Sequence, residues 1–460
     1  MNAPHKTARP LQASSCEQRC IDCGAMFAVG ERIYTCRKCG GLLEIDCALE
    51  TLAGAAELRS VWHSRGLSIE PRDRSGVWRY REVLPFDSSA PIVTLFEGNT
   101  PLYEAPKCAR FTGLSELRLK HQGCNPTGSF KDTGMTTAVT QARILGARVV
   151  VCASTGNTAA SLAAYAARAD MECLVLLPEG QVSPAKLAQS MDYGAKILEV
   201  AGNFDDCMRL TQELADVSWI YIANSINPFR IEGQKTVAYE LMEQLAWRVP
   251  DHVVVPGGNM GNSSALGKGF DEMLRIGLID RLPKLHIIQA EGAAPLSQLF
   301  SKISASGTRT QEHRLTRLEA VAQPRTLATA IKIGAPVSWK KALRAVLQSK
   351  GSIIAISESE LADSKAVIGL EGIGCEPASA ATVAGIKKLV TAGSIAQNDS
   401  VVAVLTGHVL KDPDYASQYH RDILQHEAAK GPEAIHGTFR NAPARVAATK
   451  EAIIKKLEQN

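Results

Sequence analysis

Short apolar runs alternate with helix-like stretches along most of the chain, from about residue 134 to residue 407. The runs are rich in Val, Ile and Leu and are apolar throughout rather than at every second position, which is typical of strands buried on both faces. Strands of this kind separated by helices favour parallel sheets with helices on both sides, a doubly wound α/β fold. The predicted strands are 147–154, 172–179, 195–200, 219–225, 252–258, 285–292, 351–357 and 400–407, and the predicted helices include 158–169, 183–194 and 234–247.

The composition fits a globular protein with two or three domains. The chain has 460 residues, of which 45% are apolar, and its net charge of +4 is too small to favour nucleic acid or a membrane surface as a partner. No apolar run approaches the length of a membrane span, and the first residues lack the apolar core of a signal peptide. Most of the 12 cysteines stand singly in apolar segments, as reduced thiols do in cytosolic proteins. We therefore expect a cytoplasmic protein.

Four cysteines near the N-terminus break this pattern. Cys20 and Cys23 form one Cys-x-x-Cys pair, and Cys36 and Cys39 form another after a gap of twelve residues, which is the spacing of a zinc ribbon. A glycine follows each pair and suits the tight turn that lets two thiolates face one ion. The spacing favours a structural zinc site, with redox or vestigial cysteines as the alternative. Two further cysteines, at positions 16 and 47, flank the motif without fitting its spacing and are expected to be bystanders.

Polar residues at the ends of three predicted strands mark the candidate ligand site, because ligands of doubly wound sheets bind beyond the carboxyl ends of the strands. The first strand end carries residues 154–158, where N–H groups at a helix start can bind an anion. The second carries residues 257–262, whose glycines let the backbone approach a phosphate while two asparagines add donors. The third leaves Thr406. Each turn alone also fits ordinary helix capping, so the argument for a ligand depends on all three.

Lys131 lies in segment 125–135, which is unusually rich in Gly, Pro, Ser and Thr for the surroundings of a surface lysine. A lysine amine, a donor-rich cradle for phosphate and a partner for a ring nitrogen are what pyridoxal phosphate (PLP) requires of a protein. The segment NPTGSFKD resembles the cofactor-lysine motif of the threonine synthases, which belong to the fold-type II family of PLP enzymes. The other matching segments follow in the family's order and are STGNTAAS (154–161), NSINPFRIEGQKT (224–236), PGGNMGN (256–262), CEPASAA (375–381) and LTGH (405–408).

The resemblance implies the fold of the tryptophan synthase β family, with two doubly wound α/β domains and the cofactor between them. The large domain would comprise 51–134 and 235–412, and the small domain 135–234. A zinc-ribbon-like segment, 1–50, would precede them, and a polar helical tail, 413–460, would follow.

The resemblance also implies roles for individual residues. Lys131 would form the Schiff base with PLP and later move protons between substrate carbons. Asn157 would meet the cofactor's phenolic oxygen, and Thr406 its ring nitrogen. The phosphate loop would be Gly257, Gly258, Asn259, Met260, Gly261 and Asn262, and the substrate would be bound by Ser154, Thr155, Thr158, Asn224, Ser225 and Arg230. Within this last set the arginine suits a substrate phosphate, because its planar fork can meet two oxygens at once.

These roles imply conversion of O-phospho-L-homoserine and water to L-threonine and phosphate. A β-replacement on O-phospho-L-serine, as in a cysteate synthase, would use most of the same substrate-binding residues, which we call the substrate clamp. This reaction stays open as the alternative. A dehydratase fits less well, because such enzymes lack the arginine segment. A nucleic-acid-binding module on an inactive scaffold would require a basic surface and lost cofactor residues, and the sequence has neither.

Several segments resemble the plant-type branch of the family, which is activated by S-adenosylmethionine. They are 40–46, 75–85, 96–103 and 441–446. The family also implies a homodimer. One departure is Thr133, where many bacterial relatives have an arginine, so the role of that arginine has no counterpart here.

Overall fold

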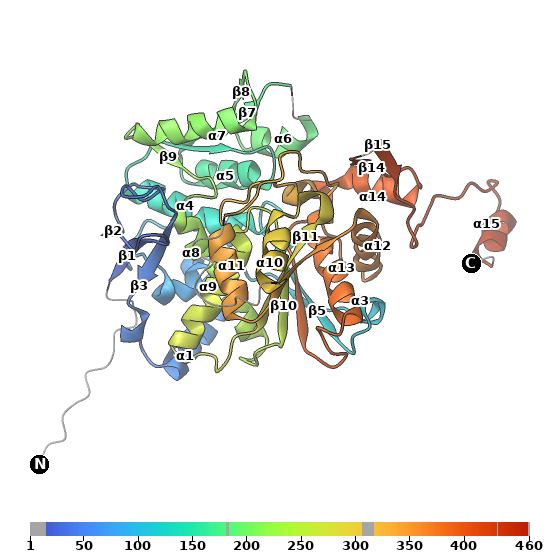
Figure 1. Ribbon diagram of the computed structural model, residues 1–460, viewed down its shortest axis with the longest axis horizontal. Coiled ribbons are helices and arrows are strands. Elements are labelled where there is room, and N and C mark those ends of the chain that lie inside the picture. Colours follow the sequence, from blue (N-terminus) through green and yellow to red (C-terminus); the bar gives the residue numbers. More distant parts are fainter. Residues whose placement is uncertain (1–14, 181–183, 306–316, 430, 459–460) are drawn as a thin grey trace, which may run out of the picture.

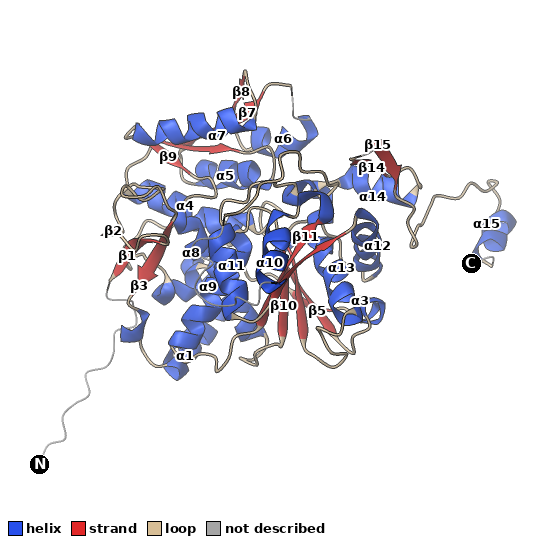
Figure 2. Cartoon of the chain, in the orientation of Figure 1, coloured by secondary structure: helices blue, strands red, loops and turns tan. Residues whose placement is uncertain are grey.

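The computed structural model describes residues 15–180, 184–305, 317–429 and 431–458. Two sheets with helices packed around them form the body of the molecule (Figure 1, Figure 2). The larger sheet has six strands in the order β12-β11-β10-β13-β5-β4, all parallel except for the antiparallel pair β4 and β5. Its strands are β4 (Leu102–Glu104), β5 (Leu117–His121), β10 (His252–Pro256), β11 (Lys284–Ala290), β12 (Ser352–Ile356) and β13 (Val401–Leu405).

The smaller sheet is wholly parallel and has the order β8-β7-β6-β9. Its strands are β6 (Val149–Ala153), β7 (Glu172–Pro178), β8 (Lys196–Val200) and β9 (Ile220–Ile222). Every strand predicted from an apolar run is confirmed, as β6 to β13. The sequence pattern missed β5, because this buried strand carries Arg118, Lys120 and His121 among its five residues.

Helices cover both faces of the larger sheet, as the uninterrupted apolar strands predicted. Val253 and Val255 of β10 pack on one side with side chains of α8, α9 and α11, whereas Val254 packs on the other side with α3, α12 and α13. The helices of this part are α3 (Pro106–Thr112), α8 (Pro228–Gln244), α9 (Gly261–Arg275), α10 (Pro295–Ala305), α11 (Trp339–Gln348), α12 (Glu358–Leu370) and α13 (Pro377–Thr391). The smaller sheet is covered by α4 (Lys131–Ile144), α5 (Asn157–Arg168), α6 (Pro184–Asp192) and α7 (Phe204–Glu213), and the chain enters the body through α1 (Ala55–Gly66) and α2 (Pro71–Arg74).

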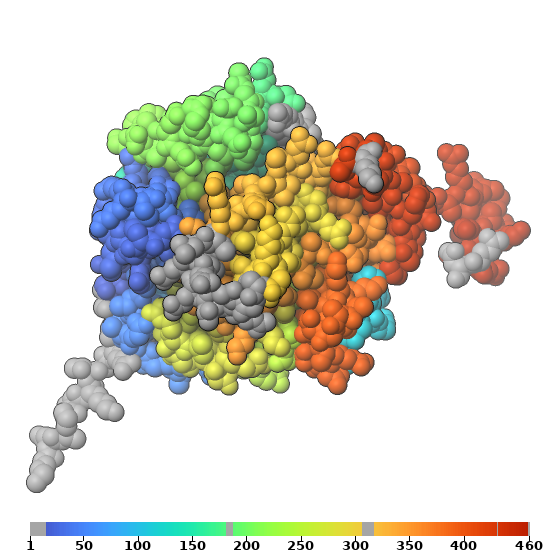
Figure 3. All heavy atoms as spheres, viewed as in Figure 1, coloured from blue at the N-terminus to red at the C-terminus, as the bar shows by residue number. Residues whose placement is uncertain are grey.

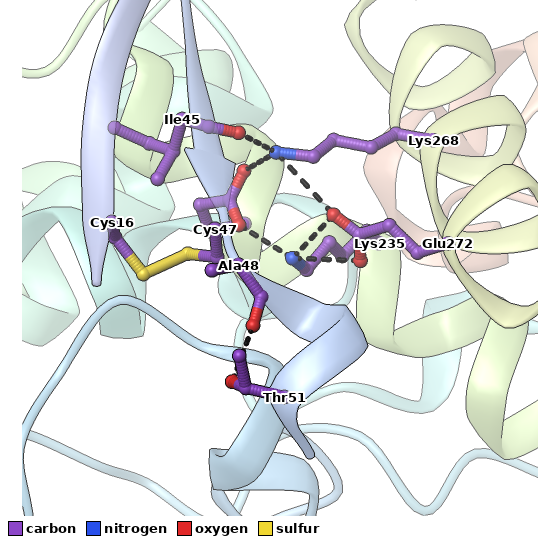
Figure 4. Close-up of a disulfide and its surroundings, with 9 residues drawn as sticks. Cys16, Ile45, Cys47, Ala48, Thr51, Lys235, Lys268 and Glu272 are labelled. Atoms are coloured by element: carbon purple, nitrogen blue, oxygen red, sulfur yellow. Dashed lines mark hydrogen bonds and ion pairs between the residues drawn. A yellow bond between two sulfur atoms is a disulfide. The ribbon is translucent and has the colours of Figure 1, made fainter. Parts of the chain in front are cut away.

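The N-terminal segment forms a separate antiparallel sheet of three strands in the order β2-β1-β3, with β1 at Cys16–Cys20, β2 at Met26–Ala28 and β3 at Leu43–Cys47. A disulfide joins Cys16 to Cys47, which are direct partners in the register of β1 and β3 (Figure 4). These two cysteines were expected to be bystanders of the zinc motif, and the sequence predicted no bond between them. Spacing along the chain does not mark them as a pair, and only the antiparallel register places them opposite each other.

This N-terminal sheet contacts the elements around both larger sheets. The amine of Lys268 on α9 donates to the carbonyl of Ile45 at 2.5 Å, beside Lys235 and Glu272 (Figure 4). On the other side, the hydroxyl of Tyr34 accepts the N–H of Ile222 on β9 at 2.8 Å. The segment is thus fixed to the strand that leads into the predicted substrate clamp.

The C-terminal tail differs from the expected helical tail. It contains the helices α14 (Pro413–His420) and α15 (Lys450–Leu457), but also an antiparallel hairpin of β14 (Gln425–Ala428) and β15 (Gly431–Ala434). The tail departs from a helix because short polar segments of this kind carry no strong helical period. Helix α15 projects beyond the main body (Figure 3) and has no buried residue. Within the described ranges, no helix combines the length and apolar character that a membrane span requires.

Candidate active site

The segment that carries Lys131 is fixed to the carboxyl end of β13. The N–H of Phe130 donates to the carbonyl of Thr406 at 2.9 Å, and Ser129 forms an isolated antiparallel bridge with Gly407. Helix α4 begins at Lys131 itself, so the lysine stands at the point where the loop after β5 becomes a helix. The structure therefore brings together two residues that lie far apart in the sequence and that were both predicted to face the cofactor.

The surroundings of Lys131 favour its neutral amine. Burial is the main cause and the guanidinium of Arg230 the next, and together they lower the pKa of Lys131 to about 7, while the carboxyl group of Glu376 opposes this shift. The amine lies 3.9 Å from the centre of the Phe130 ring. A lysine amine that is largely unprotonated near neutral pH is what both nucleophilic attack and proton transfer require.

Asp132, the next residue, holds the lysine segment against α5. Its buried carboxylate accepts the N–H of Thr127 at 2.7 Å, the hydroxyl of Thr127 at 2.6 Å and the hydroxyl of Ser161 at 2.6 Å. Burial raises the pKa of Asp132 to about 6 despite these bonds. The loop around Lys131 is thus held by side-chain hydrogen bonds at its start and by backbone bonds to β13 at its centre.

Asn157 and Thr406, the predicted partners of the cofactor ring, meet at one carboxyl group. The side-chain amide of Asn157 donates to Glu376 at 2.9 Å, and the hydroxyl of Thr406 donates to the same carboxyl group at 3.0 Å. Ser379 supports Thr406 through hydrogen bonds to its hydroxyl and N–H. Sequence analysis gave no role to Glu376, and the only available signal was its place in the CEPASAA segment.

The predicted phosphate loop has the shape of an anion cradle. A Cβ at position 257 would lie 2.6 Å from Ile287, and one at position 258 would lie 2.9 Å from the carbonyl of Ala330, so only glycine fits at either place. Met260 has a φ of 65°, in the left-handed region that such residues seldom adopt, and it precedes Gly261, the first residue of α9. The helix N-terminus therefore opens directly onto the loop, as phosphate sites require.

Asn262 supplies the observation that tests whether PLP fits here. Both polar atoms of its buried amide lack a hydrogen-bond partner among the described residues, and so does the hydroxyl of Ser263. Buried polar groups are normally hydrogen-bonded, so an orphaned amide at the start of a helix indicates a missing polar ligand. The loop fits the phosphate of PLP in both shape and donors.

Arg230 of the predicted substrate clamp is buried near the start of α8. One of its guanidinium nitrogens donates to the carbonyl of Ala223 at 3.0 Å, whereas Nε has no partner among the described residues. Burial lowers the pKa of Arg230 to about 10, so the group keeps its charge at neutral pH. A buried cation with unused donors matches the needs of a phosphate site.

The other clamp residues connect this arginine to the rest of the site. Asn224 exchanges hydrogen bonds of 3.2 Å with the backbone of Ala153, which joins the ends of β9 and β6. The hydroxyl of Ser225 accepts the amide of Asn259 at 2.9 Å, so the clamp and the phosphate loop touch. The remaining predicted substrate residues, Ser154, Thr155 and Thr158, are partly exposed at the start of α5.

The four N-terminal cysteines form a separate candidate metal site. The sulfur atoms of Cys20 and Cys39 lie 3.5 Å apart, those of Cys23 and Cys36 lie 3.6 Å apart, and all four lie within 4.8 Å of one another. Thiolates placed tetrahedrally at about 2.3 Å from one zinc ion are about 3.8 Å apart. The cluster is therefore compatible with structural zinc.

Comparisons with known proteins point to one family. The family model for pyridoxal-phosphate dependent enzymes matches residues 93–407. A curated threonine synthase from Methanocaldococcus jannaschii is 49% identical over 412 residues, which cover 89% of this chain and 96% of that protein. The threonine synthase of Mycobacterium tuberculosis is 48% identical over 339 residues, covering 73% of this chain and 88% of that protein.

The chain belongs to the threonine synthase family of PLP-dependent enzymes. Solved structures with lower sequence identity show the same fold. A threonine deaminase from Solanum lycopersicum superposes with a TM-score of 0.56 at 19% identity, covering 67% of this chain and 79% of that chain. Maize serine racemase gives a TM-score of 0.56 at 18% identity, covering 70% and 92%. The fold-type II architecture expected from the sequence is confirmed.

Proposed function

We propose that the chain is a lyase that converts O-phospho-L-homoserine and water to L-threonine and phosphate, the last step of threonine biosynthesis, in the cytoplasm. The family supports this reaction, and one structural observation carries it to the substrate. The buried charge of Arg230 lies close enough to Lys131 to lower the pKa of the lysine, and its Nε is unused among the described residues. A cation this close to the cofactor lysine suits a substrate whose phosphate group lies a few bonds from its amino group.

In this proposal the residues divide the work. PLP would be held by Lys131, Asn157, Thr406 and the loop 257–262, and when bound it supplies an electron sink for negative charge on substrate carbons. The amine of Lys131, with its pKa near neutrality, takes up and returns protons at these carbons. Arg230 binds the substrate phosphate and keeps the released phosphate close to the carbon that water attacks.

The test is turnover by the purified full-length chain loaded with PLP. Release of both phosphate and L-threonine from O-phospho-L-homoserine is the expected result. O-phospho-L-serine offered at the same concentration should react much more slowly, because its phosphate is one carbon nearer to the amino group. Preference for O-phospho-L-serine would support the β-replacement alternative instead. Lys131→Ala serves as the inactive control.

We also propose that the cysteine cluster binds one structural zinc ion. The two sulfur–sulfur distances of 3.5 and 3.6 Å support it, and so does the presence of one buried and one exposed cysteine in each pair. Elemental analysis should find about one zinc per chain. An ordered N-terminal sheet in metal-free protein would contradict the proposal.

We infer further that two copies of the chain associate. Helix α15 supports a dimer, because Ile453, Ile454 and Leu457 are exposed on a helix of eight residues that has no buried residue. Helices this short are marginal in water without a packing partner. Light scattering should give twice the mass of the chain, and a monomeric mass at micromolar concentration would refute the inference.

Activation by S-adenosylmethionine is a further proposal, which rests on the plant-type segments. Two of them pack together, since the N–H of Gly76 donates to the carbonyl of Glu97 at 2.7 Å, and Asn99 and Thr100 donate to Glu240 of α8. An effector bound beside this unit would act through the helix that carries Arg230. Activation requires tighter binding to one conformer than to the other. Identical rate curves with and without the effector would contradict the proposal.

A further inference from the structure

Glu376 is a buried carboxyl group at the centre of the candidate site. Only 4% of the residue is exposed, and the residue directly precedes α13. The side chain packs against the backbone of Gly407, where a Cβ would lie 2.3 Å from its carboxyl carbon, and its N–H donates to the carbonyl of Gly407 at 3.0 Å. The carboxyl group is therefore fixed at the end of β13, beside the residue that was assigned to the cofactor's ring nitrogen.

The hydroxyl of Thr406 has one proton to donate, and two acceptors compete for it: the carboxyl group of Glu376 and the ring nitrogen of the cofactor. The hydroxyl of Ser379 accepts the N–H groups of Thr406 and Gly407, at 2.8 and 3.1 Å, so its own proton is available for the oxygen of Thr406 at 3.1 Å. The hydroxyl of Thr406 in turn donates to Glu376 at 3.0 Å. While Glu376 is ionised it accepts this proton, and only a lone pair of Thr406 remains for a ring nitrogen.

Glu376 also holds the second ring partner. Its other oxygen accepts the amide of Asn157 at 2.9 Å, although these residues are 219 positions apart in the sequence. We propose that Glu376 is a positioning residue of the PLP site, which holds Asn157 and Thr406 together and decides, through its own protonation, whether Thr406 can donate to the ring nitrogen. This proposal rests on the proposed PLP function and deepens it.

The surroundings of Glu376 make both protonation states accessible. Burial raises the pKa of Glu376, while the hydrogen bonds from Asn157 and Thr406 lower it. The amines of Lys131 on α4 and Lys411 after β13 also lower it, and the thiol of Cys375 is a further titratable neighbour. A carboxyl group so balanced titrates closer to neutral pH than a free glutamate does.

The proposal predicts distinct behaviour for two substitutions. Glu376→Gln keeps the shape, accepts from Asn157 and donates from its own amide to Thr406, so it reproduces the protonated acid at every pH. The hydroxyl proton of Thr406 is then free for the ring. Glu376→Ala leaves both ring partners unsupported. Glu358→Gln is the matched control, because Glu358 is also a buried glutamate at the start of a helix, and its carboxyl group accepts the backbone N–H of Leu327 at 3.2 Å.

The test measures the affinity of the cofactor-free, full-length proteins for pyridoxine 5′-phosphate between pH 6 and pH 9. This probe lacks the aldehyde, so Lys131 forms no covalent bond with it. The Gln variant should bind about tenfold more tightly than wild type at pH 9, the equivalent of one hydrogen bond, and the difference should narrow as the pH falls. The Ala variant should bind about tenfold more weakly than the Gln variant throughout, and the control should follow wild type.

Thermal unfolding of each cofactor-free protein shows that the variants are folded before binding is compared. Equal affinities of wild type and Glu376→Gln at all pH values, in proteins that bind the probe, would overturn the proposal and leave the proposed function intact. Failure of wild type to bind the probe would overturn the PLP site itself, and this proposal with it.

Discussion

Arg230 offers the sharpest test of the substrate assignment, because its loss should lower kcat/KM and raise the pKa of Lys131. The residue is 3% exposed, keeps its charge at neutral pH with a pKa of about 10, and uses one guanidinium nitrogen for Ala223. Arg230→Ala removes the charge-assisted bonds to the substrate phosphate, a loss that typically costs about 2–5 kcal/mol. The ratio kcat/KM for O-phospho-L-homoserine should therefore fall by about 30-fold or more.

The second quantity is the pKa of Lys131, which the charge of Arg230 lowers. Removing a nearby positive charge favours the ammonium form, so the pKa of Lys131 should rise in Arg230→Ala. Since the neutral amine captures PLP, the rate of cofactor incorporation into cofactor-free protein should reach half its maximum near pH 7 in wild type and at higher pH in the variant. Arg230→Lys keeps the charge and should show a smaller shift, while kcat/KM still falls because the planar fork is lost.

Arg281→Ala is the matched control for general effects of losing an arginine. Its side chain is 47% exposed and forms a surface ion pair with Asp251, far along the strands from Lys131. It should leave both quantities unchanged. Near-normal kcat/KM in Arg230→Ala would refute the clamp assignment and, with it, the argument for a phosphorylated substrate. A loss of kcat/KM without any shift in the pH profile would refute the electrostatic coupling alone.

Four further outcomes are expected. Lys131→Ala should abolish threonine formation and the Schiff-base absorbance, and residual turnover would disprove its role. Lys120→Met should lower the free energy of unfolding in urea by about 3–5 kcal/mol, because it leaves the buried carboxylate of Glu240 without its cation. Adding Glu240→Gln to this variant should recover most of the lost stability. A loss under about 1 kcal/mol in Lys120→Met alone would argue against the ion pair. Cys36→Ser should lower zinc content and the stability of the N-terminal sheet but leave the PLP spectrum unchanged, and full zinc content would count against the site. Burial lowers the pKa of His286 to about 3, so stability should fall as pH drops from about 6.5 towards 3, and His286→Gln should weaken this dependence when chemical unfolding is followed at each pH.

Short sequence segments were enough to predict the strands and to single out Lys131 as the candidate cofactor lysine. The strands β6 to β13 lie in apolar runs, so they could be predicted one by one, whereas the buried parallel strand β5 has charged residues and could not. The glycines of the predicted phosphate loop also stand out locally, and the structure shows that a Cβ at Gly257 or Gly258 would clash with Ile287 or Ala330. Such features depend on neighbours in the chain and are readable without the fold.

Pairings between distant segments were decided only by the tertiary structure. Glu376 carries no local signal, yet the fold places its carboxyl group between Asn157 and Thr406. Lys120 lies in a polar stretch of the sequence, but its side chain is fully buried because Glu240 on a distant helix neutralises its charge. The disulfide partners of β1 and β3 likewise became a pair only through strand register. Charge compensation and register depend on which segments meet in space, and a single sequence does not encode these meetings in any local pattern.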